Sequence, residues 1–167
     1  KVVAITISTI APMIATVDEG FAYLESFTNF ERMTGKMRPW RLERMAELCR
    51  RAGNPEQRLS VFHIAGSKGK GSTATYLAAL AEAAGDSTGL YTSPHLEDYR
   101  ERITRAGEFL PEESYLRGLR RLEEIVEEIK SEGHRGDALP STFELLTLLA
   151  FDLFGELRRA VLETGLG

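Results

Sequence analysis

Cysteine is nearly missing from this sequence, which has 167 residues and a single cysteine, Cys49. One thiol cannot form a disulfide within the chain, so the composition fits a reducing compartment, and we expect a cytoplasmic protein. Cys49 lies in a helical pattern, where we expect an inert core residue. The three histidines, at positions 63, 95 and 134, share no spacing typical of a zinc site.

Long apolar runs and an excess of positive charge are also missing. No stretch reaches the ~20 apolar residues of a membrane-spanning helix, so we expect no membrane partner. The apolar residues 1–15 are interrupted by Pro12 and lead to no convincing cleavage pattern, which favours an N-terminal strand or lead-in over a signal peptide. A net charge of −4 and a pI near 5.5 argue against a nucleic-acid partner.

The apolar content, 43% of the residues, is sufficient for one sizeable α/β core, and we expect one folded domain over residues 16–167 after the lead-in. Periodicity and capping residues predict strands near 60–65, 88–92 and 159–164, a further strand from Glu101, and helices from Thr16, from Trp40, from about Ser72, over 112–132 and over 141–154. In the last helix, Ser141 and Glu144 have the spacing of a capping box. This order predicts a three-layer α/β fold of the P-loop NTPase type with a mostly parallel sheet.

The central stretch is VFHIAGSKGKGST at residues 61–73, where an apolar run breaks into glycines, lysines and hydroxyl residues. The order is typical of a strand, a phosphate-binding loop and a helix whose positive dipole end attracts an anion. Positive φ angles are expected at Gly66, Gly69 and Gly71, because they would bring successive amide groups close to a ligand. A glycine-rich turn without a ligand is the alternative.

Side chains of this stretch could complete a nucleotide site. Lys70 would place its charge on a β- or γ-phosphate, and Ser72 or Thr73 would offer a hydroxyl to magnesium. The strict Walker pattern nevertheless fails, because it requires glycine where Ile64 stands and serine or threonine where Gly71 stands.

Two other polar groups follow predicted strands. Ser93 comes after the strand at 88–92, at the carboxyl edge where open α/β sheets bind ligands, although an ordinary Ser-Pro turn is equally compatible with it. His95, two residues later, is expected to anchor the loop. Glu163 ends the last strand, where a carboxylate opposite a phosphate loop suits magnesium; the alternative is a strand-end acid that faces solvent.

Four motifs together resemble the folylpolyglutamate synthase and dihydrofolate synthase family of the Mur ligase superfamily. They are HIAGSKGKGST at 63–73, GLYTSPHL at 89–96 with ERI at 101–103, TFE at 142–144 and VLETGLG at 161–167. The resemblance runs from about Tyr23 to the last residue, and the family's loop carries the same extra glycine that breaks the Walker pattern. The family usually has Thr-Asn where this chain has Ser67 and Lys68.

The resemblance implies roles for individual residues. Residues that would bind ATP, with Lys70 as the catalytic one, are Gly66, Ser67, Lys68, Gly69, Lys70, Gly71 and Ser72. Magnesium would be held by Ser93 and Glu163, with Ser72 as a further ligand. Substrate contacts are implied at Arg38, Pro39, Trp40 and Ser141.

The implied activity is ATP-dependent ligation of L-glutamate to a folate or dihydropteroate carboxylate through an acyl phosphate. A nucleotide-binding module without ligase activity and a small-molecule kinase are the alternatives. Family members continue past Gly167 with a C-terminal domain that receives glutamate, so residues 16–167 would be an incomplete ATP-binding domain. We expect the full-length enzyme to be a monomer, and this chain alone to bind ATP weakly, to ligate nothing and to self-associate through a sheet edge exposed beyond Glu163.

Overall fold

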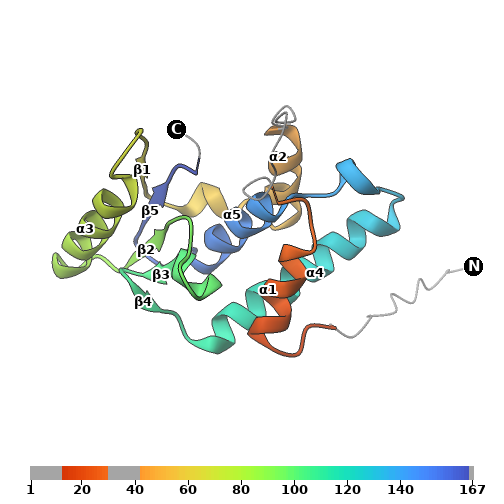
Figure 1. The fold of residues 1–167 in the computed structure, drawn as a ribbon, viewed down its shortest axis with the longest axis horizontal. Coiled ribbons are helices and arrows are strands. Elements are labelled where there is room, and N and C mark those ends of the chain that lie inside the picture. The colour runs from red at the N-terminus through yellow and green to blue at the C-terminus, as the bar shows by residue number, and fades with distance from the viewer. Residues whose placement is uncertain (1–12, 30–41, 166–167) are drawn as a thin grey trace, which may run out of the picture.

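The computed structural model describes residues 13–29 and 42–165, which form five α-helices, five strands and three short 3-10 helices (Figure 1). In chain order the elements are α1 (Val17–Glu25), α2 (Leu42–Arg51), η2 (Pro55–Arg58), β1 (Val61–Ile64), α3 (Lys70–Ala83), β2 (Thr88–Tyr91), η3 (Tyr99–Arg102), β3 (Ile103–Arg105), β4 (Glu108–Phe109), α4 (Glu112–Ser131), η4 (Gly136–Ala138), α5 (Thr142–Leu153) and β5 (Arg159–Glu163).

The sheet is mixed, with the strand order β1-β5-β2-β3-β4. The three strands predicted as parallel are confirmed: β5 lies between β1 and β2 and runs parallel to both, with Glu163 opposite Ile64 and Leu162 opposite Tyr91. The β3 and β4 strands extend the sheet antiparallel to β2. Because parallel strands end at the same edge, the segments that follow β1, β2 and β5 meet there.

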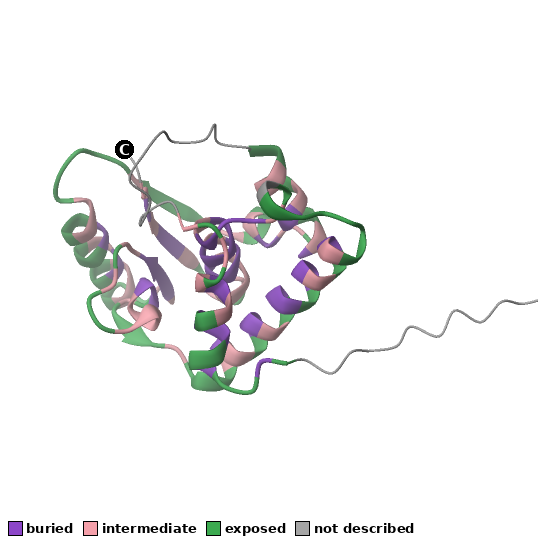
Figure 2. Ribbon diagram, turned by 45° about the vertical axis from the view of Figure 1, so that its right-hand side comes forward, coloured by how far each residue is buried: buried purple, intermediate pink, exposed green. Residues whose placement is uncertain are grey.

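Helices cover both faces of the sheet, which confirms the three-layer α/β prediction. Figure 1 shows α3 on one side of the strands and α5 on the other, with α1 and α4 further from the strands than α5. The α3 side holds a small core of Ala74, Ala78, Leu90 and Val161. The α5 side holds the main core, and Figure 2 shows α5 largely buried while much of α3 is exposed.

Local sequence signals explain why the helices of the main core begin where they do. Thr16 and Glu19 form a capping box before α1, as Ser141 and Glu144 do before α5, and each pair satisfies backbone amides that have no partner inside the helix.

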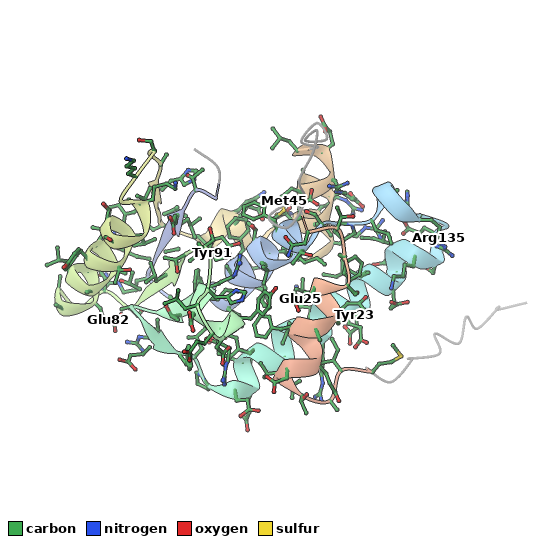
Figure 3. All side chains as sticks on the ribbon, viewed as in Figure 1. Tyr23, Glu25, Met45, Glu82, Tyr91 and Arg135 are labelled. Atoms are coloured by element: carbon green, nitrogen blue, oxygen red, sulfur yellow. The ribbon has the colours of Figure 1, made fainter. Side chains whose placement is uncertain are left out.

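A side-chain contact also links the sheet to α5. Tyr91 extends from β2 toward α5, where its hydroxyl lies 3.5 Å from Thr147 Oγ1 (Figure 3).

The cysteine is buried as predicted. Only 5% of Cys49 is exposed, and burial, followed by the nearby charge of Glu56, raises the pKa of its thiol to about 12. The thiol therefore stays protonated and unreactive at neutral pH.

Two predictions about the sheet are wrong. The strand expected from Glu101 begins at Ile103, because Asp98 and Glu101 form a capping box that holds residues 99–102 in η3. The open edge does not lie beside Glu163, since β5 is paired on both sides; in the described part of the chain, β1 is the parallel strand with a single neighbour.

Two other expectations concern the N-terminal segment and membranes. Residues 1–12 of the predicted lead-in lie outside the described ranges. In the part of the chain that is described, none of the helices combines the length and apolar character needed to cross a bilayer.

Candidate functional site

The loop between β1 and α3 has the backbone of an anion site. Gly69 has a φ of 74°, in the left-handed region that favours glycine, and is the N-cap of α3, while Gly66 has a φ of 158°. The helix therefore begins at Lys70, two residues before the predicted Ser72. Amides in the first turn of a helix have no acceptor inside it, so those of Lys70, Gly71 and Ser72 are available to an anion.

Side chains place positive charge over this loop. The Nζ atom of Lys70 donates to the carbonyl oxygen of Gly66 at 3.0 Å, so the ammonium group folds back across the loop. Ser67 and Lys68, which precede the N-cap, are exposed. The loop thus carries two lysines and several amide donors at this sheet edge.

The hydroxyl groups at the helix start differ in their surroundings. Thr73 Oγ1 donates to the Gly69 carbonyl oxygen at 2.8 Å, a bond that ties this hydroxyl to the helix backbone. Ser72 is exposed in the first turn. Of the two hydroxyls proposed for magnesium, that of Thr73 therefore has a backbone partner and that of Ser72 lies in the exposed first turn.

Glu163 lies against both the phosphate loop and the loop after β2. The backbone amide of Ser93 donates to Glu163 Oε2 at 3.0 Å, and a β-carbon added at Gly71 would lie 3.5 Å from the same oxygen. Glu163 is only 8% exposed, so the alternative of a strand-end acid facing solvent is excluded. Gly71 is helical and needs no positive φ, which corrects its prediction; the 3.5 Å spacing is an ordinary van der Waals contact and places the carboxylate beside the helix start.

The donor atoms gathered here fit magnesium. This ion prefers oxygen ligands, usually takes one or two carboxylates from the protein and completes its shell with water and substrate phosphates. Across residues 13–29 and 42–165 no group of three or more His, Cys, Asp or Glu side chains could enclose a metal. A single carboxylate beside an anion-binding loop suits an ion that arrives with phosphate groups.

A further carboxylate, which the sequence reading missed, organises the loop that carries Ser93. Glu101 accepts backbone N–H groups from Leu96 at 2.7 Å, Asp98 at 2.9 Å and Glu97 at 3.1 Å. These bonds lower the pKa of the Glu101 carboxyl below its usual range. The capping-box spacing of Asp98 and Glu101 was the available signal.

His95 anchors the same loop, as predicted. Its Nδ1 atom accepts a hydrogen bond from Arg102 Nε at 2.8 Å, and its ring centroid lies 4.1 Å from that of Tyr99. Arg102 itself is buried. His95 is thereby tied to the element that follows its own loop.

The predicted substrate residues are not brought to this edge by any described contact. Ser141 is 1% exposed, and its hydroxyl donates to Glu144 Oε2 at 2.7 Å within the cap of α5. Arg44 pairs with the same carboxylate at 2.8 Å. Arg38, Pro39 and Trp40 lie outside the described ranges. Substrate contact by these four residues stays a prediction.

Comparison with known proteins finds relatives of one family over most of the chain. A dihydrofolate synthase/folylpolyglutamate synthase from Bacillus subtilis is 33% identical over 129 residues, which are 75% of this chain and 29% of that protein. The crystal structure of folylpolyglutamate synthase from Thermotoga maritima matches 90% of this chain with a TM-score of 0.77 and 35% identity. A folylpolyglutamate synthase complex with AMPPCP and folate matches 91% with a TM-score of 0.79 and 30% identity.

No family model matches the chain. The chain covers 33% and 36% of the two solved structures, so it spans about a third of the length of the relatives it matches. Over most of its own length, this chain is a homologue of the folylpolyglutamate synthase and dihydrofolate synthase family of the Mur ligase superfamily.

Proposed function

We propose that this chain forms the ATP-binding part of a ligase that joins L-glutamate to a folate or dihydropteroate carboxylate. The observation that carries the proposal is the contact of Glu163 with the Ser93 amide beside the start of α3, because it unites three segments distant in sequence at one anion-binding edge. The AMPPCP and folate named for the solved relative supply the substrate classes.

In this proposal a carboxylate oxygen of the folate attacks the γ-phosphorus of ATP, and ADP leaves. The amine of glutamate then attacks the acyl carbon, loses a proton and displaces phosphate, which leaves an amide. Lys70 and the amides at the start of α3 stabilise charge on the transferred phosphoryl group. Glu163, Ser93 and Ser72 would hold magnesium, which neutralises phosphate charge when bound. The proposed substrate contacts are Arg38, Pro39, Trp40 and Ser141.

Gly66, Ser67, Lys68 and Gly69 contribute the rest of the nucleotide cradle in this proposal. Lys68 replaces an uncharged residue of the resembled motif, so it adds a second cation near the phosphates. The single buried cysteine supports a reducing, cytoplasmic location.

Calorimetry of the 167-residue chain with ATP, with and without magnesium, tests the nucleotide site. We expect magnesium-dependent binding that Lys70→Ala weakens by about ten-fold or more, since a charge-assisted phosphate contact is lost. Lys130→Ala, on α4, is the matched control, because it removes an ammonium group far from the loop in sequence and fold. The absence of nucleotide binding in all conditions would contradict the proposal.

Product analysis with ATP, folate or dihydropteroate, and glutamate separates the ligase from its alternatives. Product analysis of this chain distinguishes three outcomes. A glutamyl amide whose formation depends on glutamate supports the ligase. A stable phosphate ester supports a small-molecule kinase, and nucleotide binding without either product supports a binding module.

A further inference from the structure

His63 and Thr164 connect the two segments that form the candidate site. β1 and β5 are paired with Ile64 opposite Glu163, and the amide of Thr164 donates to the Ile64 carbonyl oxygen at 2.9 Å. That bond extends the ladder one residue past Glu163. Next to it, His63 Nε2 lies 2.8 Å from Thr164 Oγ1, so a side-chain hydrogen bond reinforces the end of the ladder.

The position of this bond matters because β1 is an edge strand. Among residues 13–29 and 42–165, β5 is its single neighbour in the sheet, so within this part of the chain its carboxyl end is held from one side. The phosphate loop leaves β1 directly after Ile64, and Glu163 directly precedes Thr164. Ends of edge strands open more readily than central strands, and any opening here changes the spacing between the loop and the carboxylate.

We infer that His63 is a positioning residue: its hydrogen bond to Thr164 fixes the end of β1 against the end of β5 and so sets the separation between the phosphate loop and Glu163. The inference rests on the proposed function, since that separation matters only when a nucleotide and its magnesium ion bridge the two segments. The nucleotide and its magnesium ion bind most tightly when the phosphate loop and Glu163 are already held at the right distance, because binding then costs less free energy for ordering these two segments.

Thr164→Val is the sharpest test, since it keeps the shape of the side chain and removes only the hydroxyl. The quantity to measure is the ratio of the ATP dissociation constants without and with magnesium. One hydrogen bond contributes about 0.5–1.5 kcal/mol, so we expect the ratio to fall about three-fold to ten-fold in Thr164→Val and in His63→Ala. The dissociation constant without magnesium should stay unchanged, and the double variant should lose no more than either single variant.

A purely structural contact would behave differently. It would lower the melting temperature of both variants and leave the ratio of the ATP dissociation constants without and with magnesium at the wild-type value. That result would overturn the inference. Thr147→Val, which loses the bond from Thr147 Oγ1 to the Phe143 carbonyl oxygen inside α5 and the contact with the Tyr91 hydroxyl, is the control for stability. In His63→Gln the side-chain amide can still form a hydrogen bond to the Thr164 hydroxyl, so the ratio of dissociation constants should lie between those of His63→Ala and the wild type.

The same titrations separate this inference from the proposed function. If the wild-type chain binds ATP with magnesium and the ratio survives in both single variants, the positioning role fails and the nucleotide site stands. If the wild-type chain binds no ATP in either condition, the proposed function fails and the positioning role fails with it.

Discussion

The carboxylate of Glu163 is the residue on which the proposed nucleotide site depends most. We expect Glu163→Gln to reduce ATP affinity in the presence of magnesium by about ten-fold, because it removes the charge that magnesium needs and keeps an oxygen for the Ser93 amide. Calorimetry should show little change without magnesium. Glu156→Gln, in the exposed turn before β5, makes the same charge change and should bind as the wild type does.

Glu101 stabilises the loop that carries Ser93, and the size of this stabilisation should depend on pH. Its pKa is lowered in the folded chain by the amides of Leu96, Asp98 and Glu97, so its stabilising contribution is present above the unfolded pKa of about 4.3 and is lost as the pH falls through the folded value. Glu101→Gln should therefore be less stable than the wild type at pH 7 and approach it in acid.

Urea denaturation at a series of pH values measures this difference. Glu108→Gln, on exposed β4, is a control that should show no such convergence. A stability gap for Glu101→Gln that is equally large at pH 7 and below the folded pKa would show that the charge of Glu101 is not what holds the loop.

At the scale of elements, β2 and α5 approach so closely that only glycine fits between them. A β-carbon at Gly89 would lie 2.4 Å from Phe154 Cδ1, well inside contact distance, and Phe154 is completely buried. We expect Gly89→Ala to destabilise the chain by about 1–3 kcal/mol, because the ring has no free volume into which it can move.

Denaturation midpoints would report this loss. Adding Phe154→Leu should restore part of it, since the smaller side chain makes room for the methyl group, although Phe154→Leu alone is destabilising. Strictly additive effects of the two substitutions would mean that the contact between β2 and α5 is not the cause.

At the scale of the whole molecule, the open β1 edge should promote association between copies. Within the described ranges β1 pairs with one strand in the sheet, and Val61 and Phe62 are 42% and 38% exposed. Unpaired edge strands with exposed apolar side chains pair readily with other chains. We expect the sedimentation coefficient of the 167-residue chain to rise with concentration, and Phe62→Lys to remove most of that rise.

Phe109→Lys is the control at the opposite edge of the sheet. Phe109 is 49% exposed, but β4 has only two residues and offers little backbone for pairing. Equal effects of the two lysine substitutions would indicate general apolar association instead of pairing through β1.

Much of the local structure was determined by the sequence alone. Short apolar runs located β1, β2 and β5, and capping residues located the starts of α1 and α5, because these signals act through neighbours a few residues away. The glycines and lysines of residues 66–70 predicted an anion-binding loop for the same reason. Local signals were misleading at Glu101, where a capping box overrode an apparent strand.

The tertiary structure decided how these segments meet. The insertion of β5 between β1 and β2 brings Glu163 to the amide of Ser93 and to the start of α3. It also brings Thr164 to His63, a contact between residues that are 101 positions apart. Periodicity records which face of a strand is buried and not which strand lies beside it, so strand order and the contacts that follow from it depend on packing of the whole chain.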